Sequence, residues 1–218
     1  MNKKLNAFWE NDVDKANKHF IGDLPPDKTQ RMLKRVDKHI LSHLDFEKIH
    51  TSLDWGSGGG LFSKILAQKS KLIAADLSEE SLAETKRYTG NNSIQTLLIP
   101  ENPENIALPD DEIDLLFCHA VIHHFPSPEY AQTIFNLWTQ KIRPKFFGLH
   151  IKIGDKTIEK GNYFQGKNFL NALYLNENDF VNTFTDTGYK VVNKAYEINR
   201  YSNPEHTMKV GYFVFKKE

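Results

Sequence analysis

Residues 53–66 read LDWGSGGGLFSKIL, and this stretch decides the fold. An apolar residue and an acid end a predicted strand, a glycine run makes a turn, and an amphipathic helix begins at once. Gly56, Gly58 and Gly60 let the backbone approach a ligand closely, because no Cβ stands in the way. The helix directs its unpaired N–H groups toward whatever lies in the turn. The stretch therefore predicts a strand, a ligand-binding turn and a helix.

A second predicted strand, over residues 71–75, ends at Asp76, 20 residues after Gly56. A carboxylate at this place suits a bidentate grip on ribose hydroxyls. The order of strand, glycine turn, helix, strand and acid indicates an adenosine-containing ligand at the carboxyl edge of a parallel sheet. The pattern departs from the nicotinamide and flavin fingerprint, whose third glycine would fall at Leu61.

With Asp54 two residues before the first glycine, the turn resembles motif I of the class I S-adenosylmethionine-dependent methyltransferases. Three downstream stretches resemble the same family around its fourth strand and before its fifth: LPDDEIDLLF at 108–117, VIHHF at 121–125 and IRP at 142–144. The resemblance covers residues 50–153. It implies S-adenosylmethionine as cofactor, S-adenosylhomocysteine as product and methyl transfer as the activity.

The resemblance also implies which residues bind the cofactor: the motif I acid and glycines hold the methionine end, and Asp76 holds the ribose. The predicted set is Asp54, Gly56, Ser57, Gly58, Gly60, Asp76, Leu77, Asn102, Pro103, Cys118 and His119. Two positions depart from the family. Asn102 stands where an aspartate commonly accepts from the adenine amino group, and its carbonyl can still accept. Pro103 lacks the N–H that the family offers to the ring, so either Glu104 supplies that donor or the loop register differs.

Histidines crowd the loop after the predicted fourth strand, at His119, His123 and His124. If the acceptor is a hydroxyl or an ammonium, a base must take its proton, and histidine suits this role at neutral pH. The resemblance favours His124 as that base, with a loop-capping role as the alternative. His150, late in the fifth strand, is a second catalytic candidate, with a bond inside the sheet edge as the alternative. We predict no metal site, because no partnering Cys-x-x-Cys or His-Glu-x-x-His motif is present.

Composition favours a compact enzyme of one domain, since 218 residues suffice for a full sheet and two helical layers. Lysine plus arginine and aspartate plus glutamate number 28 each, so the basic excess expected of a nucleic-acid enzyme is missing. The single cysteine, Cys118, fits a reducing compartment, and no apolar run reaches the length of a membrane span. We expect a cytoplasmic monomer or homodimer without a membrane or nucleic-acid partner.

Strand and helix patterns alternate along the chain and predict an α/β fold. The expected architecture is a doubly wound, mostly parallel, seven-stranded Rossmann-like sheet with an antiparallel C-terminal hairpin and N-terminal helices. Strands are predicted near residues 51–55, 71–75, 94–99, 113–118, 146–153, 189–198 and 208–216. Helices are predicted near residues 5–20, 27–44, 61–69, 78–88, 128–142 and 178–187, with Ser78 and Ser127 as N-caps.

Within one methyltransferase domain, residues 1–48 are expected to form a helical lid and 49–153 the cofactor-binding core. Residues 154–187 form a substrate-facing insertion, and residues 188–218 the closing strands. Aromatic residues in the lid, with Phe8 and Trp9, and in the segment 162–174 suit a small, partly apolar acceptor.

The sequence thus predicts methyl transfer to an oxygen or nitrogen of a small-molecule acceptor. An RNA methyltransferase and a non-catalytic S-adenosylmethionine sensor with a protein partner are the alternatives. The balanced charge argues against RNA.

Overall fold

The computed structural model describes residues 26–100, 102–158, 172–198 and 208–218. One sheet forms its centre, in the order β3-β2-β1-β4-β5-β8-β7, with a short β6 beside β5. The strands are β1 (Thr51–Trp55), β2 (Lys71–Asp76), β3 (Gln95–Leu98), β4 (Leu115–His119), β5 (Phe146–Gly154), β6 (Leu175–Asn176), β7 (Tyr189–Ile198) and β8 (Met208–Lys217). The α-helices are α2 (Pro26–His39), α3 (Leu61–Leu66), α4 (Glu79–Thr89), α5 (Pro128–Asn136) and α6 (Glu177–Thr185).

Strands β1 to β5 pair in parallel, whereas β8 runs antiparallel to both β5 and β7. This topology confirms the predicted α/β class and its antiparallel C-terminal strands. The strand order reverses between β1 and β4, and crevices at such a reversal are where open α/β sheets bind ligands. The carboxyl ends of β1, β2, β4 and β5 therefore share one edge, which positions the candidate site.

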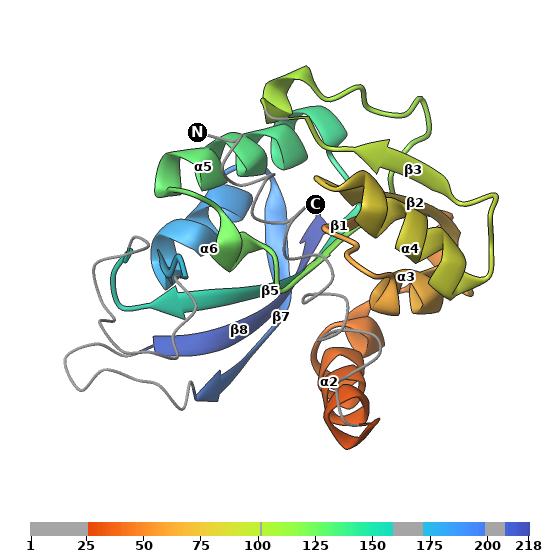
Figure 1. Cartoon of the computed structure of the whole chain (residues 1–218). Coiled ribbons are helices and arrows are strands. Elements are labelled where there is room, and N and C mark those ends of the chain that lie inside the picture. The colour runs from red at the N-terminus through yellow and green to blue at the C-terminus, as the bar shows by residue number, and fades with distance from the viewer. Residues whose placement is uncertain (1–25, 101, 159–171, 199–207) are drawn as a thin grey trace.

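Helices cover both faces of the sheet (Figure 1). On one face, α5 and α6 bury Ile134, Phe135 and Phe180 in a cluster that contains Leu53 and Phe147 of the sheet. On the other face, α2, α3 and α4 build a second cluster, which includes Val36, Ile40, Phe62, Leu66 and Leu82. The chain therefore forms the three layers expected of a doubly wound fold.

Several predicted boundaries were wrong. The helix predicted to reach residue 44 ends at His39, and a 3₁₀ turn, η2 (Leu41–His43), follows. There the Ser42 hydroxyl donates to the Lys38 carbonyl, a side-chain bond that competes with the helical ladder. The helix predicted over 128–142 continues past α5 as a π-helix, η6 (Leu137–Ile142), which Arg143 ends in a left-handed conformation. An eighth strand, the two-residue β6, was missed.

Three further 3₁₀ turns connect these elements: η3 (Phe46–Lys48), η4 (Pro103–Asn105) and η5 (Ile122–His124). The predicted caps are confirmed, because the Ser78 hydroxyl accepts from the Ser81 N–H and the Ser127 hydroxyl accepts from the Tyr130 N–H. The helix predicted at 5–20, with Phe8 and Trp9, lies outside the described residues, as does 159–171 of the predicted insertion. Among the helices that the structure describes, none is long and apolar enough to cross a membrane.

Candidate functional site

The glycine turn, residues 56–60, joins β1 to α3 at the carboxyl edge of the sheet. The N–H groups of Gly56 and Ser57 both donate to the Ala75 carbonyl of β2, at 2.7 and 3.0 Å. Gly56 has a φ of 78°, and a Cβ there would lie 2.2 Å from a methyl carbon of Val121. Only glycine fits this position, because any side chain would collide with the loop that follows β4.

Gly58 and Gly60 serve different purposes in the turn. A Cβ on Gly60 would lie 2.9 Å from the Thr85 Cα of α4, so this glycine lets α4 pack against the turn. A Cβ on Gly58 would have no atom within 4 Å. Gly58 therefore borders open space, where a ligand can approach its backbone.

Asp76 links the glycine turn to the end of β2. One carboxylate oxygen accepts from the Gly58 N–H at 2.9 Å, and the other accepts from the Ser78 N–H at 3.1 Å. Burial raises the pKa of Asp76, and these backbone donors counteract part of that rise. Each oxygen has a second lone pair, so the carboxylate can still accept two ligand hydroxyls while it fixes the turn. Leu77, half-buried, follows directly.

Asp54 lies beneath the turn and is almost fully buried. Its carboxylate accepts from the Ser63 hydroxyl of α3 at 2.5 Å. Burial raises the pKa of Asp54 to about 7, which the Ser63 bond partly opposes and the charge of Asp76 reinforces. The carboxyl group can therefore change its protonation state near neutral pH.

The predicted adenine contacts lie in η4. Asn102 is exposed, and its side-chain oxygen accepts from the Glu104 N–H at 3.1 Å. Pro103 is buried and has no N–H. The Glu104 N–H is thus already paired, so this arrangement does not support Glu104 as the missing donor to the adenine ring. Asn102 retains one lone pair for a ligand, and its predicted role stays a prediction.

His119 ends β4 and stacks on its partner in the middle of β5, His150, with ring centroids 4.3 Å apart. Phe62 of α3 lies 4.5 Å from the His119 ring. Burial lowers the pKa of both imidazoles, that of His150 to about 4. The Ala120 N–H donates to Nδ1 of His150 at 3.2 Å, so the neutral ring carries its proton on Nε2. His150 is therefore arranged as a hydrogen-bond donor, whereas a general base needs an open lone pair.

The two remaining histidines sit in η5, with ring centroids 4.1 Å apart. His123 is buried, and its carbonyl accepts from the Leu173 N–H at 2.8 Å. His124 is half-buried, and its N–H donates to the Val121 carbonyl at 2.8 Å. The Val121 side chain packs beside Gly56 of the glycine turn, so this bond links the His124 main chain to the residue next to that turn.

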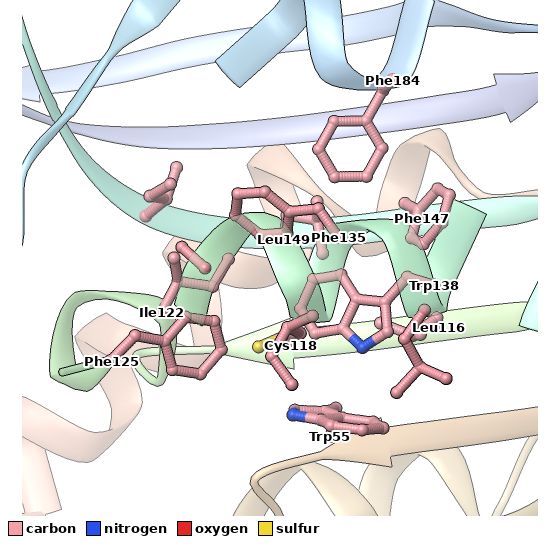
Figure 2. Close-up of a cluster of buried hydrophobic side chains, with 14 of the residues drawn as sticks. Trp55, Leu116, Cys118, Ile122, Phe125, Phe135, Trp138, Phe147, Leu149 and Phe184 are labelled. Carbon is pink, nitrogen blue, oxygen red and sulfur yellow. The ribbon is translucent and has the colours of Figure 1, made fainter. Parts of the chain in front are cut away.

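The side chain of Cys118 lies in the hydrophobic core and not among the polar groups of the candidate site. Its side chain is fully buried in the larger core cluster, among Trp55, Ile122 and Phe125 (Figure 2). Any contact of this residue with a cofactor would have to come from its main chain. Within the described residues, no three His, Cys, Asp or Glu side chains gather where they could hold a metal ion.

Two polar residues of the site were missed from the sequence. Ser63 holds Asp54, and Thr85 donates to the Gly58 carbonyl at 2.9 Å and lies 3.2 Å from the Ser57 hydroxyl. Both are fully buried, and buried hydroxyls need such partners. The signal available in the sequence was a polar residue on the apolar side of each helix.

The fold and part of the sequence resemble those of known proteins. Residues 53–140 match the family described as a methyltransferase domain. No curated protein sequence matches the chain. A solved structure of magnesium protoporphyrin IX methyltransferase from Synechocystis, with bound S-adenosylmethionine, superposes with a TM-score of 0.69. It is 14% identical, and the match covers 100% of this chain and 97% of that one.

Two further solved structures have the same fold. The 1,6-didemethyltoxoflavin-N1-methyltransferase from Burkholderia thailandensis has a TM-score of 0.65 at 15% identity, with 98% of this chain and 87% of that chain covered. The N-methyltransferase NodS from Bradyrhizobium japonicum has a TM-score of 0.61 at 13% identity, with 95% and 98% covered. Both contain S-adenosylhomocysteine. Residues 53–140 therefore match a methyltransferase domain, and the chain as a whole shares the fold of solved S-adenosylmethionine-dependent methyltransferases.

Proposed function

We propose that this enzyme transfers the methyl group of S-adenosylmethionine to an oxygen or nitrogen of a small-molecule acceptor. The observation that carries the proposal is the bond from the Gly58 N–H to Asp76, which joins the glycine turn and the ribose-binding acid into one unit. This unit shares the carboxyl edge of the sheet with the histidines that follow β4.

The residues present fit the cofactor. Open space at Gly58 admits a ligand against the backbone, and the Asp76 oxygens keep lone pairs for ribose hydroxyls. Asp54, Ser57 and the turn would hold the methionine end. The cofactor supplies an electrophilic methyl group, so the protein contributes mainly by holding the acceptor in line.

A small acceptor is supported by two observations. The structural neighbours are named for a porphyrin and for toxoflavin, which are small molecules. The chain also has equal numbers of acidic and basic residues, whereas RNA binding depends on a basic surface. We propose His124 as the base that takes the acceptor's proton, because His150 already uses Nδ1 to accept from Ala120.

The alternatives give different results in the same assays. A sensor protein would bind S-adenosylmethionine yet release no S-adenosylhomocysteine with any acceptor. An RNA methyltransferase would bind RNA with an affinity that falls steeply as salt rises. A radiolabelled-methyl screen against metabolite and RNA fractions therefore tests the proposal directly, since only the proposed enzyme labels the metabolite fraction.

Cofactor binding is expected to stabilise the protein. S-adenosylhomocysteine at 100 times its Kd should add about 2.7 kcal/mol to the free energy of unfolding. The melting temperature, followed by differential scanning fluorimetry, should rise by several degrees, and NAD should leave it unchanged. A rise with NAD but none with S-adenosylhomocysteine would overturn the cofactor assignment.

Cofactor affinity is also expected to depend on pH through Asp54, whose pKa burial raises to about 7. A raised carboxyl pKa means that the folded, unliganded protein loses stability as pH rises from 3.8 toward 7, because ionisation is disfavoured in the fold. A cationic amino group at the methionine end of the cofactor favours the ionised carboxylate. The Kd for S-adenosylhomocysteine should therefore increase about tenfold between pH 8 and pH 6.

Calorimetry in buffers of different ionisation enthalpy tests this expectation, since binding near pH 6 should release a proton. Asp54→Asn keeps the size of the side chain and can still accept from Ser63. This variant should bind more weakly at pH 8 and lose the pH dependence. An unchanged slope in the variant would assign the dependence to another group.

A further inference from the structure

Lys152 is a cation in an unusual place, the carboxyl end of β5. It pairs with Val210 of β8 and lies two residues beyond His150, so both side chains share the sheet face that α2 covers. The lysine is half-buried, and its Nζ lies 5.7 Å from the centroid of the Tyr174 ring. Met208 and Ile158 pack with Tyr174, so the lysine stem meets an apolar surface.

No carboxylate balances this charge within the part of the chain that the structure describes. Every ion pair found there involves other cations, and no acidic group contributes to the pKa of Lys152, which burial alone lowers. A partly buried ammonium without a counter-ion is costly, because desolvation is not offset by an ion pair. A ligand that brings an anion to this place would remove the cost.

His123 adds a second unsatisfied group. The residue is 6% exposed, and its Nδ1 has no hydrogen-bond partner among the described residues. The His123 carbonyl accepts from the N–H of Leu173, the neighbour of Tyr174, whose ring lies beside Lys152. His150 lies two residues before Lys152 on β5, and the charge of Lys152 acts on both imidazoles. Burial is the main cause of the low pKa of both imidazoles, and the charge of Lys152 adds to it. Lys152 thus supplies the one positive charge of the group at neutral pH.

We propose that Lys152, with His123 beside it, forms a subsite for a carboxylate group of the methyl acceptor. The inference rests on the proposed function and names its substrate class: a small carboxylic acid whose apolar body lies against Tyr174. The Lys152 ammonium donates to the carboxylate, and the His123 imidazole donates to it through Nδ1. One positive charge matches a singly charged carboxylate, whereas a phosphate dianion would need a second cation.

Matched pairs of carboxylic acids and their primary amides test this subsite, because each pair differs in charge and little in shape. We expect the acids to raise the melting temperature of the wild-type protein and the amides to leave it unchanged, with or without S-adenosylhomocysteine. For the best acid, calorimetry should show at least tenfold weaker binding to Lys152→Met. Lys152→Arg should retain most of the affinity.

Lys190→Met is the matched control, since Lys190 is an exposed strand lysine on β7 and its loss should leave acid binding unaltered. The affinity of Lys152→Met for S-adenosylhomocysteine reports whether the variant is folded. Equal responses to acids and amides, no response to any acid, or full acid binding by Lys152→Met would overturn the subsite. A wild-type protein that prefers acids but binds no S-adenosylhomocysteine would instead overturn the proposed function.

Discussion

Replacing His124 by alanine should lower turnover by roughly 10²–10⁴, while the Kd for S-adenosylhomocysteine stays nearly constant. The reason is that the imidazole takes the acceptor's proton as the methyl group is transferred. His124 ends η5, and its N–H donates to Val121, the residue that touches Gly56. The His124 main chain is thus bonded to the residue that packs beside the glycine turn.

The pH profile separates this role from a structural one. Turnover of the wild-type enzyme should fall at acid pH as the imidazole protonates, and His124→Ala should lack this acid limb. If the histidine only holds the loop, the melting temperature and cofactor affinity should drop instead, and the profile should keep its shape. Single-turnover rates across pH, measured with the acceptor found by the methyl-transfer screen, make the comparison.

His150→Ala is the control for this experiment. Its Nδ1 accepts from the Ala120 N–H, and Ala120 has a left-handed φ of 59° that the loop must maintain. Losing the bond should disturb the loop and reduce turnover modestly, but the acid limb should remain, because burial already lowers the pKa of His150 to about 4. A folded His124→Ala enzyme with wild-type turnover would end the general-base assignment and leave positioning as the source of rate.

The structural features that could be predicted from the sequence are those that depend on a few neighbouring residues. Gly56 and Gly60 must be glycine because of backbone conformation and close approach, and both requirements mark the chain locally. The caps at Ser78 and Ser127 likewise depend on residues three positions away. Parallel pairing then follows from the alternation of strands and helices, whereas the order of the strands in the sheet was not predicted.

What the sequence did not reveal depends on contacts between distant residues. The bond from Thr85 to Gly58 spans 27 residues, and only the packing of α4 on the turn creates it. The π-helix at η6 has no local signal either: the Arg143 N–H donates to the carbonyl of Trp138, a fully buried residue five positions back. Lys152 was not singled out from the sequence, because only the pairing of β5 with β8 and the contact with Tyr174 make its position unusual.

Some predictions stay untested for a simpler reason. The proposed lid residues Phe8 and Trp9 lie outside the described part of the chain, as does most of the segment 162–174. The four-part division of the domain, the cytoplasmic location and the choice between monomer and homodimer also stay predictions.

Asp76→Ala should weaken S-adenosylhomocysteine binding by about 1.5–3 kcal/mol, which is roughly a 10- to 150-fold increase in Kd. The variant loses the charge-assisted acceptors for ribose hydroxyls. It also leaves the Gly58 and Ser78 N–H groups without their partner, so the glycine turn loses one of its anchors. The free energy of unfolding should change much less, because the lost bonds are offset by removing a carboxylate whose burial is itself unfavourable.

Asp76→Asn distinguishes charge from position. The amide keeps one oxygen acceptor of the same size, so it can hold either the turn or a hydroxyl but lacks the charge and the second acceptor. Its affinity should fall between those of the wild type and Asp76→Ala. Asp110→Ala, in an exposed turn, controls for the loss of one negative charge and should bind as the wild type does. Calorimetry gives the cofactor affinity of all four proteins, and melting temperatures show whether each is folded. A folded Asp76→Ala variant with wild-type affinity would remove Asp76 from the cofactor site. The bond between Gly58 and Asp76 would then be purely structural.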